Sequence, residues 1–228
     1  YPISQAFYPR FCEYFEQAKW SDLATHLHKS SQLIIVIVGS IVVSFAFLSY
    51  EILAIWTKDL ALTESSALLI TALMVGNLIS GVNIIPQQLQ LARGTTSVIR
   101  NTNFLVLVLL VPLMQFGFHY SGVLGVAASW IFIHILYNLI ILLSINKNLL
   151  RGEWGKWLLR DNLLPMIAML CVGWSISSIL EPSSSAFVSV FQIIATFLAV
   201  LASGIMAATE FRLTVANYFN GLKKLSKD

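Results

Sequence analysis

The chain has 228 residues, of which 57% are apolar and only 11% are charged, and its formal net charge is +3. Soluble domains carry about 25% charged residues, so this chain has too few charges to cover a soluble surface. The composition therefore excludes a soluble globular domain, a disordered tail and a disulfide-rich scaffold, and it predicts an integral membrane protein. No basic stretch is interleaved with aromatic residues, which argues against nucleic acid as a partner.

Six apolar windows are each long enough to cross a hydrocarbon core of about 30 Å as a helix. The apolar runs are continuous and do not alternate with polar residues, which excludes a β-barrel. We therefore predict an all-α integral membrane protein with six transmembrane helices. The predicted helices cover residues 33–56, 66–90, 103–119, 123–146, 163–180 and 186–209.

The basic residues of the loops predict how these helices are oriented. Of the 14 Lys and Arg residues, only Lys58 falls in a connection on one side, and the rest fall on the other side. The positive-inside rule then places both termini in the cytoplasm. The cytoplasmic parts are an amphipathic segment (1–32), an interfacial link (147–162) and a basic tail (210–228). They flank a four-helix part (33–146) and a terminal helix pair (163–209).

Two of these cytoplasmic parts contain aromatic residues at helical spacing among cations. Phe7–Ala18 and Leu149–Leu159 both have this pattern, with Trp154 and Trp157 in the second. Such segments favour helices that lie in the lipid headgroup layer, with aromatic rings dipping inward and cations facing phosphates. The alternative interpretation is an ordinary solvated loop.

The second window carries the richest set of polar side chains. At about 100° per residue they occupy one half of the helix circumference, and apolar residues occupy the other half. This face either lines a water-filled cavity or hydrogen-bonds to neighbouring helices, and six amides and hydroxyls favour the cavity. Pro86 lies in the same window and predicts a kink, which is either a hinge or a static bend. The polar residues are Asn77, Ser80, Asn83, Gln87, Gln88 and Gln90.

Other polar residues inside the windows are candidates for the cavity or for ion coupling. His134, Tyr137 and Asn138 share one helical face at spacings i, i+3 and i+4. His134 either makes a structural hydrogen bond or couples transport to protons. Glu51 is either a coupling carboxylate or a structural residue that reaches the interface or pairs with Lys58.

The sequence contains no arrangement typical of an enzyme or a metal site. No Ser–His–Asp set, phosphate-binding loop or carboxylate pair can be argued from the spacings. His26 and His28 form an isolated HxH pattern outside the windows and are interpreted as surface residues. Cys12 and Cys171 lie far apart, which makes a disulfide or a zinc site improbable. We expect neither enzymatic activity nor a cofactor.

Several connecting segments have the order and spacing of one transporter family. The chain resembles the C-terminal half of a Wzx-type polysaccharide flippase, within the multidrug/oligosaccharidyl-lipid/polysaccharide exporter superfamily. The first two segments resemble the cytoplasmic helix of a lobe and an outer helix end. The next two resemble a polar helix with its small-residue turn and a short outer turn, and the last resembles the link before the terminal helix pair. The segments are FYPRFCEYFEQAKWSDL, EILAIWTKD, IIPQQLQLARGTTSVIRNTN, HYSGVLGVAASW and LLRGEWGKWLLRDNLLP.

The resemblance implies a two-lobed transporter of 12–14 helices in a bacterial inner membrane. The chain, which begins at Tyr1, would then be a piece of a longer protein that lacks its N-terminal lobe. The cargo would be a lipid-linked oligosaccharide, and partners would include membrane lipids and the glycan polymerase machinery. The windows contain no Arg or Lys, although some members of the superfamily are thought to hold the cargo's phosphates with such residues. Arg93 and Arg100 would therefore form a phosphate-attracting cytoplasmic mouth.

Three other functions remain open at this stage. An ion-coupled antiporter for drugs or small metabolites would typically place acidic residues in its cavity, and the second to fourth windows contain none. A membrane-embedded glycan polymerase or acyltransferase would need charged catalytic residues in the membrane or in substantial loops. A purely structural membrane scaffold would not explain the one-sided polar helix.

Overall fold

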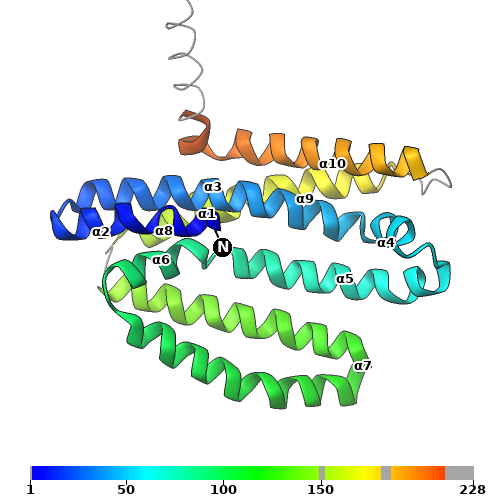
Figure 1. Ribbon diagram of the computed structural model, residues 1–228, viewed down its shortest axis with the longest axis horizontal. Coiled ribbons are helices and arrows are strands. Elements are labelled where there is room, and N and C mark those ends of the chain that lie inside the picture. Colours follow the sequence, from blue (N-terminus) through cyan, green and yellow to red (C-terminus); the bar gives the residue numbers. More distant parts are fainter. Residues whose placement is uncertain (1, 149–151, 181–185, 214–228) are drawn as a thin grey trace, which may run out of the picture.

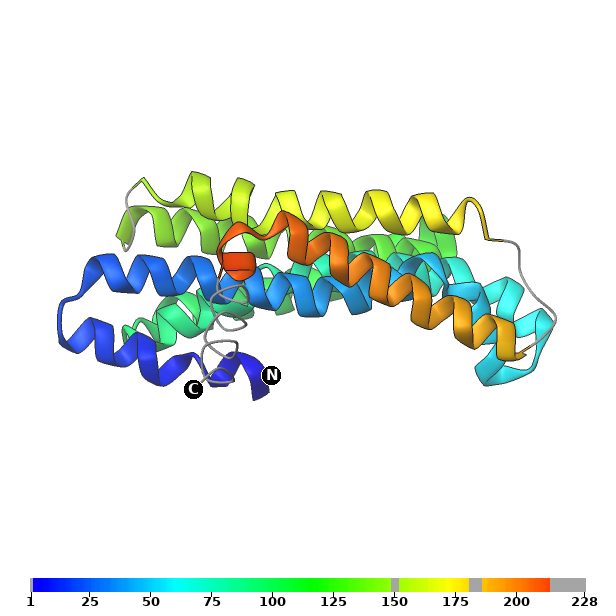
Figure 2. The same cartoon turned by 90° about the horizontal axis from the view of Figure 1, so that it is seen from above.

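The computed structural model describes residues 2–148, 152–180 and 186–213. Nearly all of these residues are helical, and none of them lies in a β-strand. The longer helices run side by side along one axis (Figures 1 and 2). The elements are α1 (Pro2–Gln5), α2 (Tyr8–Glu16), α3 (Trp20–Phe47), α4 (Ser49–Thr57), α5 (Leu60–Gly81), α6 (Ile84–Ala92), α7 (Thr96–Asn148), α8 (Trp154–Lys156), the π-helical turn η1 (Trp157–Leu163), α9 (Leu164–Ser177) and α10 (Ala186–Ala207).

Four helical stretches of the described chain are long and apolar enough to cross a membrane. Their surfaces fit a lipid environment, because large apolar side chains such as Phe104, Phe187 and Phe191 remain mostly exposed. The predicted all-helical class is confirmed, and the apolar helices are compatible with a membrane-embedded protein. The number of spans and the cytoplasmic location of the termini remain predictions. The four stretches are Trp20–Phe47, Leu60–Ala92, Thr96–Ser144 and Phe187–Ala207.

Two of the predicted windows are formed by broken helices. The window 33–56 comprises most of α3 followed by α4, with a break at Leu48, where the backbone leaves helical geometry. The window 66–90 comprises most of α5 followed by α6, with a break at Val82–Asn83. At the turn between these two windows, Asp59 caps α5 by accepting a hydrogen bond from the Leu62 amide at 3.1 Å.

The third and fourth windows form a hairpin within α7. Its two arms are separated by non-helical residues at Ser121–Gly122, where Gly122 has a φ of +59° that suits glycine. The arms cross closely at Gly117 and Gly125, because a Cβ on either residue would overlap the backbone of the other. Ser129 reinforces the crossing by donating a hydrogen bond to the Leu113 carbonyl at 2.8 Å.

The predicted cytoplasmic helices pack against the bundle. The α2 helix lies beside the first turns of α3 (Figure 1), and Phe11 is fully buried in that contact. The α8, η1 and α9 elements follow one another directly, so the fifth helix starts at Trp154 rather than at residue 163. Trp157 is buried and donates its indole N–H to Ser31 Oγ at 2.9 Å. The parts of the predicted link, outer turn and tail at residues 149–151, 181–185 and 214–228 lie outside the described residues.

Candidate functional site

The break between α5 and α6 determines how the polar helix faces its neighbours. The Asn83 amide bonds to the Ser80 carbonyl at 3.1 Å instead of to the Ile79 carbonyl four residues back. The Ile79 carbonyl accepts a hydrogen bond from Asn138 Nδ2 at 2.9 Å, so α7 replaces the donor that the break removes. Pro86 lies in the first turn of α6, where a missing N–H is tolerated. The bend therefore lies at Val82–Asn83, just before the predicted hinge residue Pro86.

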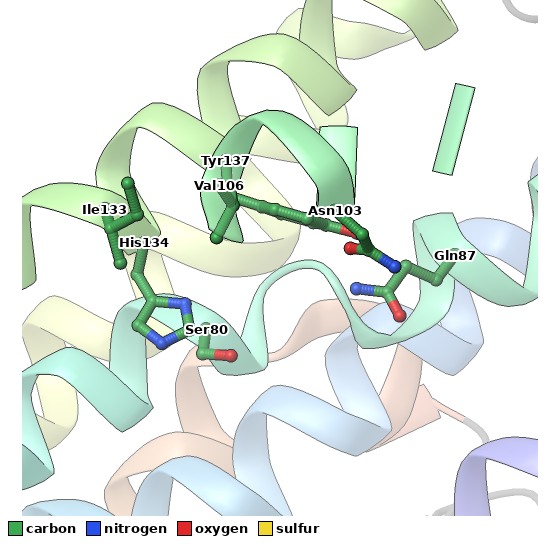
Figure 3. Close-up of a pocket in the computed structure, with 7 residues that line it drawn as sticks. All are labelled: Ser80, Gln87, Asn103, Val106, Ile133, His134 and Tyr137. Atoms are coloured by element: carbon green, nitrogen blue, oxygen red, sulfur yellow. The ribbon is translucent and has the colours of Figure 1, made fainter. Parts of the chain in front are cut away.

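A pocket of about 270 Å³ lies between this broken helix and the two arms of α7. Figure 3 shows the Gln87 and Asn103 amides directed toward one another, and the His134 ring beside Ser80. The pocket therefore joins side chains from α5, α6 and both arms of α7. Its lining residues are Ser80, Gln87, Asn103, Val106, Ile133, His134 and Tyr137.

A second pocket, of about 150 Å³, adjoins the first. Ser80 and Gln87 line both, and Ser4, Ile84 and Gln88 complete the second one. Gln87 therefore stands in the wall between the two spaces. An amide at this point can donate and accept hydrogen bonds on either side.

The lining of both pockets combines polar and apolar side chains and carries no formal charge, apart from any proton that His134 takes up. The His134 Nε2 atom is buried and has no hydrogen-bond partner among the described residues. The ring is held by an edge-to-face contact with Trp130, with the ring centroids 4.4 Å apart. A buried, unpaired nitrogen at a pocket wall is available to a polar ligand or to water.

Four of the polar residues that the sequence analysis considered for the cavity lie outside the lining of these two pockets. Asn77 is exposed on α5. Asn83 is 2% exposed and Gln90 is 1% exposed. In both residues, neither the side-chain amide nitrogen nor the side-chain oxygen has a hydrogen-bond partner among the described residues. Asn138 bonds to the Ile79 carbonyl, and its amide also donates to the His134 carbonyl at 2.8 Å. The structure thus brings Ser80, Gln87, Gln88, His134 and Tyr137 to the pockets.

Besides Ser4 in the smaller pocket, Asn103 is the polar lining residue that sequence reasoning missed. It begins the third window and was not assigned to the cavity, although Gln87 faces it across the pocket. No sequence pattern marks Asn103, because the residues three and four positions further along the helix, Val106 and Leu107, are apolar.

The predicted cytoplasmic mouth and the second coupling candidate lie apart from the pockets. Arg93 and Arg100 are both exposed near the turn between α6 and α7, and Arg100 donates to Asn101 Oδ1 at 3.3 Å. Glu51 is partly buried in the first turn of α4. It lines neither polar pocket, whereas His134 lines the larger one.

The interpretation of the HxH pair as surface residues is wrong for His28. Its side chain is only 15% exposed and contacts the Asp161 carboxylate, which comes from a segment 133 residues away in the sequence. His26 is also partly buried, within an edge-to-face contact with Phe11 at 4.9 Å between centroids. Neither interaction could be seen in the sequence, because the partners are distant along the chain. No group of three His, Cys, Asp or Glu side chains among the described residues has an arrangement that could hold a metal ion.

Comparisons with protein-family models, with characterised proteins and with solved structures find no match to this chain. The function is therefore argued from the site itself.

Proposed function

We propose that this chain is part of a flippase that moves a lipid-linked oligosaccharide from the inner to the outer leaflet of a bacterial inner membrane, for surface polysaccharide synthesis. The observation that carries the proposal is the uncharged polar pocket between α5, α6 and α7, within helices that are apolar enough to span a membrane. A sugar headgroup is rich in hydroxyls, and each hydroxyl that enters an apolar medium without a partner costs about 4–8 kcal/mol.

The pocket chemistry suits that cargo. Gln87 and Asn103 face each other with amides that both donate and accept, so they replace water around sugar hydroxyls. Arg93 and Arg100, at the neighbouring turn, would attract the anionic pyrophosphate toward the cytoplasmic end of these helices. The lipid tail would remain in the bilayer, and a second lobe would close the other side of the cavity and rock against this one.

An ion-coupled small-molecule antiporter is the alternative within the same superfamily. Such a cavity would typically hold a cationic drug with acidic residues, and none of the residues that line the two polar pockets is acidic. A glycan polymerase or acyltransferase would need charged catalytic groups, and the lining offers only His134 as a titratable group near neutral pH. The lining therefore favours a neutral, hydroxyl-rich cargo.

The test is a deletion of the intact parent gene followed by complementation. Lipid-linked oligosaccharide is measured in each membrane leaflet. We expect complete units to accumulate on the cytoplasmic face of the deletion strain. The wild-type gene should restore surface glycan, and the double variant Gln87→Leu/Asn103→Leu should reduce restoration at least tenfold at equal protein level, because its pocket lacks both amides.

Gln115→Leu is the matched control, since Gln115 is an exposed amide on α7 outside the pocket lining. It should restore glycan to the wild-type level. A normal leaflet distribution in the deletion strain would refute the flippase proposal and redirect the work to small-molecule efflux. Accumulation of flipped but unpolymerised units would indicate the polymerase instead.

A further inference from the structure

A buried polar junction connects α3 to the terminal helices. Asp161, in the π-helical turn η1, is fully buried and accepts a hydrogen bond from Gln32 Nε2 at 2.6 Å. Gln32 is also fully buried, and its Oε1 accepts from the amides of Glu210 and Phe211 at 2.9 and 3.1 Å. Gln32 thereby joins η1 to the segment that follows α10, so three parts of the chain meet at one side chain.

The π-helical turn is the local feature that brings Asp161 into this junction. Asn162 Nδ2 donates to the Trp157 carbonyl five residues back at 2.8 Å, within the widened turn. Trp157, Asp161 and Asn162 are all buried. Single π-helical turns are rare and occur frequently at functional sites.

His28 lies between two carboxylates in this junction. Its Nδ1 contacts Asp161, and its Nε2 lies 3.3 Å from Glu153 Oε2. A neutral imidazole carries a single N–H and donates to one acceptor only. Because both ring nitrogens face carboxylate oxygens, only the imidazolium can donate to both. With both carboxylates ionised, a protonated His28 is the form that satisfies both contacts.

The surrounding charges agree with this protonation state. The carboxylates of the junction belong to Glu153, Asp161 and Glu210, and the permanent cations are Lys156 and Arg160. Lys156 Nζ lies 3.2 Å from Glu153, while Arg160 pairs with Glu210 and lies 4.0 Å from Asp161. The hydrogen bond from Lys156 lowers the pKa of Glu153, so that Glu153 is ionised at neutral pH. The formal charges of the junction balance only when His28 is positive.

We propose that His28 and Asp161 form a proton-binding site, and that the bound proton fastens the terminal helices to α3. Loss of the proton leaves the buried Asp161 carboxylate facing a neutral ring. It also removes one of the two hydrogen bonds that His28 makes. Burying a carboxylate without a charged partner is costly, so the contact between α3 and η1 loosens as the proton leaves.

The proton-binding site is separate from the proposed cargo site. None of His28, Asp161 and Glu153 lines either polar pocket. Proton binding at His28 can therefore be tested independently of the flippase function, without a transport assay.

The first measurement is nitrogen NMR of the purified protein in lipid nanodiscs, labelled with ¹⁵N-histidine. The His28 resonance is identified by its loss in the variant His28→Gln. At about pH 7 we expect both His28 ring nitrogens to be protonated, although an isolated histidine with a pKa of about 6.5 is mostly neutral there. A neutral His28 ring at that pH would overturn the proposal.

The second measurement is the distance between spin labels at Thr25 on α3 and Leu159 on η1, both of which are exposed. In otherwise wild-type protein we expect a narrow distribution at about pH 7 that broadens by about pH 10, a range well above the usual histidine pKa. His28→Gln should be broad at both values. His26→Gln is the matched control from the same helix and should retain the wild-type pH dependence.

A milder variant keeps the test informative if His28→Gln does not fold. Glu153 is partly exposed, and Glu153→Gln removes one negative charge beside His28 while leaving Asp161 in place. The pH midpoint of the broadening should then fall by about 1 unit, because a neighbouring opposite charge no longer favours the imidazolium. An unchanged midpoint in Glu153→Gln, or a distribution in the wild-type background that does not change with pH, would refute the proton-binding role.

Discussion

The close contact between the two α7 arms at Gly117 and Gly125 can be tested by substitution, and this contact positions the α7 residues that line the larger pocket. A Cβ added at Gly125 would overlap the Gly117 carbonyl oxygen and lie only 3.0 Å from the Gly117 Cα, whereas ordinary contact begins near 3.4 Å. Both neighbours are backbone atoms, so no side chain can rotate away. Gly125→Ala therefore forces the arms to separate, which also lengthens the Ser129–Leu113 hydrogen bond.

The expected cost follows from these two contacts. Forcing an extra methyl group into a packed contact costs about 1–3 kcal/mol. The hydrogen bond across the arms contributes about 0.6 kcal/mol, the average for side-chain bonds within membranes. We expect Gly125→Ala to lower the free energy of unfolding by about 2–4 kcal/mol. The assay is SDS-induced unfolding of the purified protein in mixed micelles, followed by tryptophan fluorescence.

The matched control is the same chemical change at Gly155, where an added Cβ would meet no atom within 4 Å. Gly155→Ala should be neutral or stabilising by up to about 1 kcal/mol, because alanine restricts the unfolded chain. If Gly125→Ala and Gly155→Ala unfold at the same SDS fraction, the arms do not cross through these glycines. The placement of Asn103 opposite His134 and Tyr137 would then lose its basis.

Two further substitutions test the contacts around the pocket and the terminal helices. Asn138→Leu removes the hydrogen-bond donor to the Ile79 carbonyl and should lower the free energy of unfolding by about 1–2 kcal/mol in the same SDS assay. The control Gln115→Leu should change the stability little. Equal stability of the two variants would show that the break in the polar helix does not depend on the Asn138 hydrogen bond. Trp157→Phe leaves Ser31 without its indole partner and should cost about 1 kcal/mol. The Trp154 side chain is 42% exposed, so the stability of Trp154→Phe should stay within about 0.5 kcal/mol of wild type. A larger loss of stability in Trp154→Phe than in Trp157→Phe would contradict the packing of η1 on α3.

The helical class was determined by the sequence alone, because continuous apolar runs and scarce charges are local properties. The polar side of the second window was also visible, since Ser80, Gln87 and Gln88 line pockets in the structure. The ends of the helices were less well determined. The segment before residue 163 was assigned to an interfacial link, but burial of Trp157 against α3 extends the fifth helix back to Trp154.

The membership of the pocket was decided by how the helices pack. Asn77 fits the helical periodicity of the polar face yet is exposed, whereas its neighbour Gly76 packs against Trp130 of α7. Asn103 fits no pattern on its own, and it reaches Gln87 because the α7 hairpin folds back on the broken helix. The angles at which helices cross depend on how their side chains interlock over many residues. The periodicity of polar and apolar residues along one helix does not predict these angles.

The charged junction around His28 shows most clearly the difference between what the sequence predicts and what helix packing decides. From the sequence alone, His28 is predicted to lie at the surface, since an isolated HxH pattern lacks further ligands nearby. Only the tertiary structure brings Asp161 to it across 133 residues of chain, through a π-helical turn that no periodicity predicts. Hydrophobicity is a local property and determines which segments enter the apolar layer. The pairing of polar groups depends on long-range packing, and it decides which of these groups share a proton or a ligand.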